Sequence, residues 1–439
     1  MGSYVPTTAA EREQMLAQIG VKSMEDLYAA VPQQMLLHNG LNLPEGLSEL
    51  EVREKVTDLA EKNKVFKTVL RGAGSYRHFI PAVVKSMTSR EELVTCYTPY
   101  QAEISQGVLQ GTFEFQTMIC ELTGMDVANA SHYDGATAAA ETIPMCKDRK
   151  RSVAYVSETT NPQVIEVMKT YCFASNTELH VVPAKDGTTD LDALKAALGD
   201  NAACFYVQQP NFFGQLEDAA ALGEITHAAG VKFVMGVNPI ACALLPTPRS
   251  LGADIAVGDG QPLGLDTAFG GPYLGFMATT SAMTRKLPGR IVGETKDVDG
   301  KTGYVLTLSA REQHIRREKA SSNICSNQAL CAFTAGVYMS AMGEAGMKQC
   351  ARLCMSKAHY LASELCKIGC KLKYTGEFFH EFVTETACPN CRKKILDALA
   401  EKNILGGAEV DGGILWCVTE LVSKEKLDEV VSIVKEVLG

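Results

Sequence analysis

Polar residues follow three short apolar runs of the chain, and their types decide what chemistry they could do. The clusters are Gln208 to Asn211, Asn238 with Pro239, and Asp259 to Gln261. Their amides can donate and accept hydrogen bonds, and Asp259 adds a carboxylate, but no nucleophilic amine or thiol is among them. If the runs are parallel strands, the clusters meet beyond the carboxyl ends of one sheet, where ligands of such sheets bind.

The elements that must position these clusters alternate between apolar runs and helical patterns. Short apolar runs separated by helical stretches predict βαβ units and a mostly parallel sheet that is buried on both faces. The strand candidates are Val153 to Val156, Leu179 to Val182, Ala203 to Val207, Val231 to Val237, Asp254 to Val257 and Tyr273 to Met277, and the helix candidates include Pro162 to Tyr171, Leu191 to Leu198 and Ala219 to Ala229.

The two ends of the chain have other patterns. Capping boxes at Thr8 with Glu11 and at Ser48 with Glu51 predict helices in an N-terminal arm, which either wraps a partner subunit or packs as a simple extension. A long helical region from Ala329 to Gly369 is followed by the order strand, strand, helix, strand, helix. We expect an N-terminal helical arm at 1–70, a large α/β domain at 71–320 and a small C-terminal α+β domain at 321–439.

Composition and charge restrict the class of partner. The 439 residues are 46% hydrophobic and 21% charged, which is typical of soluble globular proteins. With 42 basic and 51 acidic residues the net charge is −9, which disfavours nucleic acid and acidic membranes as partners. The sequence lacks an apolar run of membrane-spanning length and a secretory signal pattern. We therefore expect a cytoplasmic protein that binds small molecules and proteins.

The fifteen cysteines predict a reducing compartment rather than a disulfide framework. They are odd in number and scattered through apolar patterns, as small reduced core residues are. Only Cys388 and Cys391 have the CxxC spacing of a redox or metal site. One such pair without a second pair is weak evidence, and the single nearby histidine, His380, does not complete a site, so we assign no metal ligand.

Two polar segments could line a pocket. Arg71 to Pro81, RGAGSYRHFIP, has too few glycines for a dinucleotide fingerprint, and a ligand-facing loop is favoured over a structural turn. Tyr97 to Gly107, YTPYQAEISQG, suits a pocket wall with phenol donors, or equally a surface turn whose tyrosines cover the core.

Two other segments could contact an anion. Ser131 to Glu141 could hold a phosphate at a helix N-terminus, but Asp134 as the N-cap of an alanine-rich helix is the favoured interpretation. Arg311 to Asn327 carries three arginines and a lysine over nine residues, which suggests contact with an anion or a partner. Glu312 with Arg316 leaves a solvated helix as the alternative.

Gln261 lies where a cofactor lysine would be expected. In pyridoxal-phosphate (PLP) enzymes of the aspartate aminotransferase fold, a lysine at such a strand end makes the cofactor an electron sink. The segment Val257 to Phe276, VGDGQPLGLDTAFGGPYLGF, resembles that region with glutamine in place of the lysine. A large parallel-sheet domain followed by a small α+β domain also suits fold-type I PLP-dependent transferases.

Together these segments resemble the P-protein, glycine dehydrogenase (decarboxylating), of the glycine cleavage system, and within it subunit 1, the α half of the two-subunit form. The motifs RGAGSYRHFIP, YTPYQAEISQG, SHYDGATAAAE, VGDGQPLGLDTAFGGPYLGF and REQHIRREKASSNICSNQ occur in the right order over nearly the whole chain. The resemblance implies an enzyme that decarboxylates glycine on PLP and passes the aminomethyl group to the lipoyl arm of H-protein.

The resemblance also implies a division of labour between subunits. It places Gln261 at the lysine position and Met235 near the position of the aspartate that pairs with the pyridinium nitrogen. PLP would then be bound covalently by the β subunit of an α2β2 assembly and not by this chain. We expect Tyr97, Tyr100 and Gln101 to face the bound glycine or the route of the lipoyl arm, and Arg311, Ser322 and Asn323 to lie near the partner's PLP phosphate.

Two alternatives stay open at this point. The chain could be a self-sufficient PLP enzyme that uses another lysine, such as Lys286 or Lys301, although neither follows a predicted strand in a glycine-rich context. It could also be a structural or regulatory paralogue whose polar loops only maintain an interface.

Overall fold

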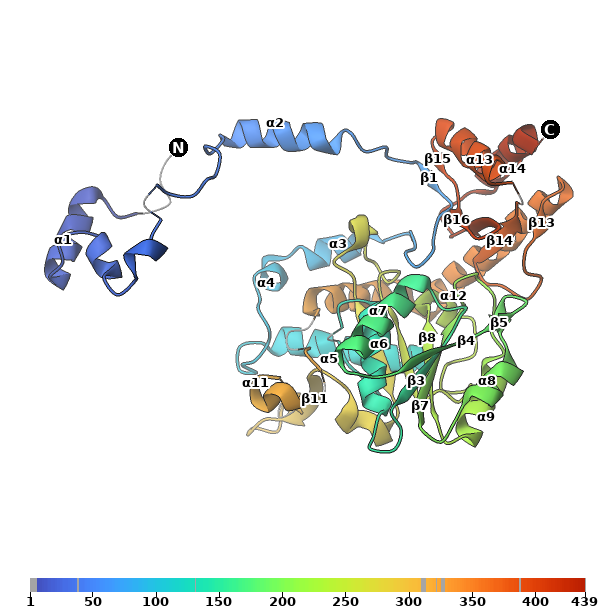
Figure 1. Ribbon diagram of the computed structural model, residues 1–439, viewed down its shortest axis with the longest axis horizontal. Helices are drawn as coiled ribbons and strands as arrows, with labels where there is room; N and C mark the ends of the chain where they lie inside the picture. The colour runs from blue at the N-terminus through green and yellow to red at the C-terminus, as the bar shows by residue number, and fades with distance from the viewer. Residues whose placement is uncertain are drawn as a thin grey trace. The chain divides into compact units, whose positions relative to one another are not determined.

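The structure, a computed structural model, describes residues 6–37, 39–130, 132–308, 313–320, 322–324, 328–386 and 388–438. Residue contacts divide the chain into two compact units, Met1–Val65 and Phe66–Gly439. Figure 1 labels the elements of both units. The three-domain division expected from the sequence stays a prediction.

The first unit is helical. Helices α1 (Ala9–Ile19) and α2 (Glu49–Ala60) begin at the two predicted capping boxes, which are confirmed because each cap side chain accepts the backbone N–H of the glutamate three residues on. Two 3-10 helices, η1 (Glu25–Tyr28) and η2 (Gln33–Met35), lie between them. No residue of α2 is buried in the described chain. Its four large apolar side chains are exposed: Leu50, Val52, Val56 and Leu59.

The second unit is built on a seven-stranded sheet with the order β2-β10-β9-β8-β7-β3-β4. Strands β9, β8, β7, β3 and β4 are parallel, whereas β10 is antiparallel to both β9 and β2. The predicted, mostly parallel sheet is therefore confirmed. The strands are β2 (Val127–Ala128), β3 (Val153–Ser157), β4 (Leu179–Val182), β7 (Ala202–Gln209), β8 (Lys232–Val237), β9 (Ile255–Asp259) and β10 (Gly275–Thr279).

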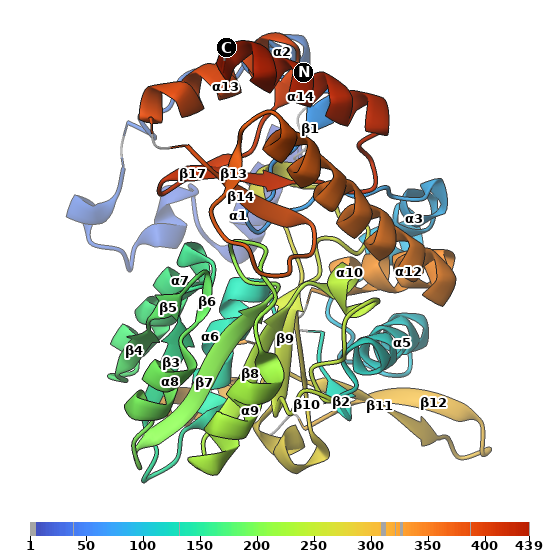
Figure 2. The ribbon, with the colours of Figure 1, turned by 90° about the vertical axis from the view of Figure 1, so that its right-hand side faces the viewer.

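Helices cover both faces of this sheet, because alternate strand residues are apolar on each side (Figure 2). One face carries Phe205 and Phe233 and packs against helices α5, α8, α9 and α12, and the other carries Val234 and Val257 and packs against α6 and α7. These helices are α5 (Gln106–Thr123), α6 (Gly135–Cys146), α7 (Pro162–Ala174), α8 (Leu191–Ala197), α9 (Ala219–Ala228) and α12 (Ala329–Lys367). Helix α12 is interrupted at Gly343, whose φ is 60°.

A second core forms around a four-stranded antiparallel sheet of order β13-β14-β17-β16. Trp416 and Phe382 of this sheet are buried with Leu361 of α12. The strands are β13 (Lys371–Leu372), β14 (Glu381–Glu385), β16 (Ala408–Val410) and β17 (Gly413–Cys417), and the helices of this region are α13 (Pro389–Glu401) and α14 (Lys424–Leu438). The C-terminal elements expected from the sequence are thus present.

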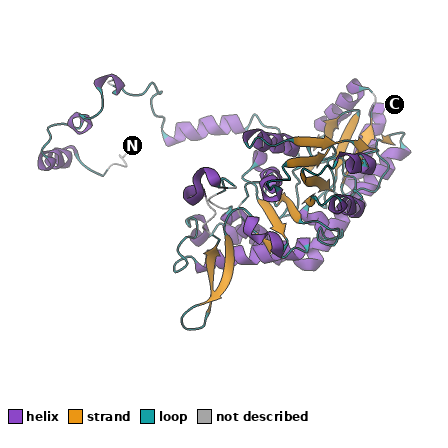
Figure 3. Cartoon of the chain, turned by 60° about the horizontal axis from the view of Figure 1, so that its bottom comes forward, coloured by secondary structure: helices purple, strands orange, loops and turns teal. Residues whose placement is uncertain are grey.

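Several short elements were not predicted. A hairpin of β11 (Ile291–Lys296) and β12 (Thr302–Thr307) projects from the second unit (Figure 3). The two-residue pairs β1 (Thr68–Val69) with β15 (Ile404–Leu405) and β5 (Ala184–Lys185) with β6 (Thr188–Thr189) are too short to leave a periodic signal. The remaining elements are α3 (Ala82–Thr88), α4 (Glu91–Val94), α10 (Pro239–Cys242), η3 (Ala268–Gly270), η4 (Ser281–Lys286), α11 (Gln313–Arg316) and η6 (Arg317–Lys319).

Candidate functional site

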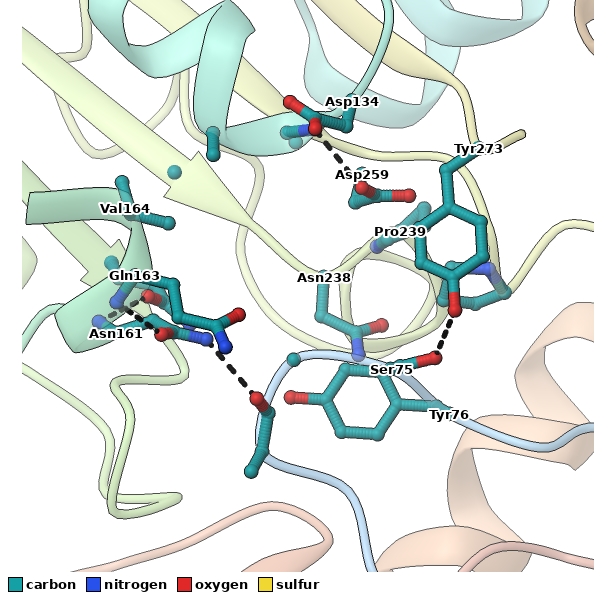
Figure 4. Close-up of a pocket in the computed structure, with 18 of the residues that line it drawn as sticks. Ser75, Tyr76, Asp134, Asn161, Gln163, Val164, Asn238, Pro239, Asp259 and Tyr273 are labelled. Carbon is teal, nitrogen blue, oxygen red and sulfur yellow. Dashed lines mark hydrogen bonds between the residues drawn. The ribbon is translucent and has the colours of Figure 1, made fainter. Parts of the chain in front are cut away.

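A cavity of about 610 Å³ lies beyond the carboxyl ends of the parallel strands. Its lining includes Gln208 near the end of β7, Asn238 after β8 and Asp259 at the end of β9, as the sequence predicted for a ligand pocket. Residues Ala73 to Tyr76 form another wall, so the predicted ligand-facing loop does line a cavity. Figure 4 shows Ser75, Tyr76, Asn238 and Asp259 around the cavity.

Gln261 fastens this loop to the end of the large sheet. Its Oε1 accepts the backbone N–H of Tyr76 at 2.9 Å, and its Nε2 donates to the carbonyl oxygens of Tyr76 at 2.8 Å and Leu265 at 2.9 Å. The side chain is 1% exposed and does not line the cavity. An amide is suited to this place because it offers an acceptor and two donors at once. Gln261 therefore has a structural task of its own.

Two acidic side chains accept hydrogen bonds from backbone N–H groups at the N-terminus of α6. Asp134 is the N-cap, as favoured from the sequence, and its Oδ1 accepts the N–H of Thr137 at 2.7 Å. Asp259 Oδ2 accepts the N–H of Gly135 at 3.0 Å, and its Oδ1 accepts the N–H of Gln261 at 2.8 Å (Figure 4). Burial raises the pKa of Asp259 to about 7, although both hydrogen bonds oppose this change. Two of the N–H groups that usually attract an anion at a helix N-terminus, those of Gly135 and Thr137, are thus bonded to carboxyl groups.

A third carboxyl group, Glu381 at the start of β14, closes the cavity from the side of the small sheet. It accepts the N–H of Ala73 at 2.7 Å and the hydroxyl of Tyr76 at 2.8 Å. Burial raises the pKa of Glu381 to about 7. Ser75 and Tyr273 hydroxyls, 2.7 Å apart, join the loop to the segment before β10 (Figure 4). The loop is thus held from three sides.

The predicted catalytic residues lie away from this cavity. Tyr97 is 78% exposed and Tyr100 is 44% exposed, and their ring centroids are 6.5 Å apart. The Arg290 guanidinium lies 4.4 Å from the centroid of the Tyr100 ring. Gln101 is also exposed. The structure brings Tyr97, Tyr100 and Gln101 together on one exposed segment, and none of them lines the cavity.

The residues predicted to lie near a partner's phosphate are only partly described. Ser322 and Asn323 line a second cavity of about 750 Å³, beside Glu141 of α6. Ser322 Oγ accepts the N–H of Ile324 at 3.1 Å. Burial raises the pKa of Glu141 to about 7. Arg311 lies outside the described residues.

The remaining candidates are not in the first cavity either. Met235 is 1% exposed and packs in the core on the face that carries Phe233, whereas the next residue, Gly236, lines the cavity. Lys286 and Lys301, the alternative lysines, are not among its lining residues. Cys388 is the N-cap of α13, and its sulfur accepts the N–H of Cys391 at 3.3 Å.

The chain is similar over its whole length to proteins of one kind. The family model described as glycine cleavage system P-protein matches residues 2–434. The chain belongs to the glycine cleavage system P-protein family. Two relatives are named probable glycine dehydrogenase (decarboxylating) subunit 1, and each is 48% identical to this chain. The match to the one from Desulfitobacterium hafniense covers 98% of both chains, and the match to the one from Moorella thermoacetica covers 100% of both.

Solved structures agree with this membership. A crystal structure of glycine decarboxylase (P-protein) of the glycine cleavage system, in inhibitor-bound form, is 41% identical with a TM-score of 0.92, and the match covers 99% of this chain and 100% of that one. An alanine–glyoxylate aminotransferase from Nostoc is 15% identical with a TM-score of 0.61 over 93% of this chain and 99% of that one, which supports the fold alone. The fold is that of fold-type I PLP-dependent enzymes, as expected from the sequence.

PLP does not fit the cavity of this P-protein family member. No lysine or arginine is among the described residues that line it. Its anion position at α6 is taken by two carboxylates, and Glu381 adds a third acidic group. A phosphate placed there would have to displace these carboxyl groups from the N–H groups of Gly135 and Thr137, and it would find no cationic side chain among the described lining residues.

The sequence indicated only part of this site. The sequence marks Asp259 as a polar residue at a strand end, but its role at α6 depends on Gly135, which lies 124 positions earlier. Glu381 is 305 residues from Tyr76, and nothing in its sequence context points to the cavity.

Within the described chain, no helix combines the length and apolar character needed to cross a membrane.

Proposed function

We propose that the chain is subunit 1 of a two-subunit glycine dehydrogenase (decarboxylating), in which the partner subunit binds PLP. The assembly decarboxylates glycine and transfers the aminomethyl group to the lipoyl arm of H-protein. This chain binds no PLP and completes the active site of a β subunit in an α2β2 complex in the cytoplasm. The observation that carries the proposal is Gln261, an amide fully engaged with Tyr76 and Leu265 at the position implied for the lysine.

The acidic cavity supports the same division of labour. A self-sufficient PLP enzyme needs a lysine and a cationic or amide-rich phosphate site in its own chain. Here the cavity is lined by acidic side chains, and the N–H groups of Gly135 and Thr137 at the start of α6 are already bonded to Asp259 and Asp134. The chemistry that PLP supplies when bound, stabilisation of negative charge at the substrate carbon, is therefore assigned to the other subunit.

The exposed aromatic and apolar side chains are the places where this chain could meet its partner. Tyr97 and Tyr100 offer phenol groups on an exposed segment, and such residues are enriched at protein interfaces. Helix α2 offers exposed leucines and valines. In the proposed assembly the Tyr97 hydroxyl orients the bound glycine or the lipoyl arm. Helix α2 packs on a partner subunit.

Borohydride reduction traps PLP that is bound to a lysine as a Schiff base. When the chain is purified alone, incubated with PLP and reduced, we expect no lysyl-PLP peptide, because no lysine is among the described residues that line its cavity. The partner subunit, treated identically, is the positive control. Peptide mass spectrometry is the measurement. A reduced lysyl-PLP peptide that contains Lys286, Lys301 or another lysine at stoichiometric yield would overturn the proposal in favour of a self-sufficient enzyme.

The second prediction concerns Tyr97. In the assembled complex, Tyr97→Phe is expected to lower kcat of glycine decarboxylation on the order of tenfold, since one positioned hydroxyl is lost from the site. Assembly, followed by size-exclusion chromatography, should be unchanged because the ring is retained. Tyr374→Phe, on a half-buried tyrosine outside the predicted site, is the matched control. Equal turnover in the two variants would remove Tyr97 from the active site.

A further inference from the structure

Four side chains that ligate metals gather in the second unit, outside the cavity. His78, Cys350, Cys354 and Glu420 each offer one ligand atom, and these four atoms all lie within 4.8 Å of one another. We call them the His78 cluster. The described part of the chain holds no other group of three or more such side chains.

Three separate segments contribute to the His78 cluster. Cys350 and Cys354 are four residues apart on α12, so their side chains lie on the same face of the helix. His78 comes from the segment that precedes α3, and Glu420 lies between β17 and α14. The histidine and both cysteines are buried, with exposed fractions of 7%, 3% and 0%. Buried polar side-chain atoms normally have a bonding partner, so the partners of these nitrogen and sulfur atoms have to be identified.

The distances within the His78 cluster are close to those of a four-coordinate metal site. His78 Nδ1 lies 2.8 Å from Glu420 Oε2 and 3.8 Å from Cys350 Sγ, and Cys354 Sγ lies 3.4 Å from Glu420 Oε2. Ligand atoms of a tetrahedral zinc site lie about 3.3–3.8 Å apart, given the usual bond lengths. The closest pair therefore has to open by about half an ångström to admit an ion.

The chemistry of the donor set selects the metal. Two thiolates and an imidazole are soft or borderline ligands, which favour zinc over magnesium or calcium, and a carboxylate completes the set. All four positions are supplied by the protein, which is typical of structural rather than catalytic zinc. We propose that the His78 cluster is a structural zinc site.

The site would join the cavity wall to the rest of the unit. His78 is two residues beyond Tyr76, which lines the cavity, and Phe79 donates its N–H to Glu420 Oε1 at 2.6 Å. Zinc would fix this segment to α12 and to the loop after β17. The alternative is a His78–Glu420 ion pair with two thiols packed beside it.

The test uses the full chain with the CxxC pair removed by Cys388→Ser and Cys391→Ser, so that these thiols cannot contribute. Elemental analysis after growth with zinc is expected to find one zinc per chain. Replacement by Co²⁺ should give thiolate-to-cobalt charge-transfer absorption and the visible bands of tetrahedral coordination. This spectrum requires no change in the cluster, so it reports the ligands even if cluster variants fold poorly.

Matched variants locate the metal. Cys350→Ser and Cys354→Ser are each expected to lower zinc affinity at least 100-fold, whereas Cys331→Ser, on the same helix but outside the cluster, should keep one zinc. Chelation should lower Tm in the parent and in Cys331→Ser only. Zinc-free protein, or cobalt spectra without thiolate bands, would overturn the proposal. Zinc that persists undiminished in both folded cluster variants would overturn it as well.

Discussion

Replacement of Gln261 by lysine is expected to destabilise the chain by about 3 kcal/mol and to leave it unable to bind PLP. The lysine has no acceptor for the N–H of Tyr76, which is bonded to Gln261 Oε1 in the native chain. It would also bring an ammonium group into a position that is 1% exposed. Introducing a lysine at this position thus breaks the hydrogen bonds that hold the cavity wall.

On the proposed function, this substitution alone does not create a PLP site. Asp134 and Asp259 remain bonded to the N–H groups of Thr137 and Gly135, so a phosphate at the N-terminus of α6 would have to displace them. We expect no Schiff-base absorbance and no borohydride trapping when Gln261→Lys is titrated with PLP. Stoichiometric trapping at the introduced lysine would show that the two carboxylates do not exclude the phosphate.

Urea denaturation measures the stability part of this prediction. Gln110→Lys is the control, because Gln110 is exposed on α5 and its partner Glu114 can equally accept from a lysine. That variant is expected to stay within about 0.5 kcal/mol of the parent. If Gln261→Lys were as stable as Gln110→Lys, the three hydrogen bonds of Gln261 would contribute little.

The large sheet was predictable because its signals are local. Buried strands such as Ala202–Gln209 are apolar runs bounded by helical patterns, and a period can be recognised within one element. The Asp134 cap was predictable for the same reason, since its partner Thr137 is three residues away. Local hydrogen-bonding rules therefore sufficed for the helix that faces the cavity.

The acidic character of the cavity was not predictable, because it depends on distant residues. Glu381, Asp259 and Tyr76 come from three regions of the chain and meet only after the small sheet packs against the large one. The role of Gln261 was missed for the same reason. From sequence the glutamine is defined by the absent lysine, whereas its partner at Tyr76 is 185 residues away.

Acidification is expected to stabilise this protein through the carboxyl groups of its cavity. The pKa of Glu381 is raised by burial from an ordinary 4.5 to about 7, and that of Asp259 from 3.8 to about 7. Between about pH 4 and pH 7 the folded state therefore binds more protons at these groups than the unfolded state does. By linkage the free energy of unfolding falls as the pH rises through this window, the reverse of an ion-paired carboxylate.

Glu381→Gln isolates one of these contributions. The amide keeps an acceptor for the N–H of Ala73, and its Nε2 can donate to the Tyr76 hydroxyl, so the variant mimics the protonated acid. We expect the stability of the variant relative to the parent to rise by about 1–2 kcal/mol between about pH 5 and pH 8. Urea denaturation of variant and parent at both pH values measures this difference, in which contributions that the two proteins share cancel. Parallel pH profiles of parent and variant would mean that Glu381 is already ionised in the folded protein at the lower pH, because the hydrogen bonds from Ala73 and Tyr76 then outweigh the cost of its burial.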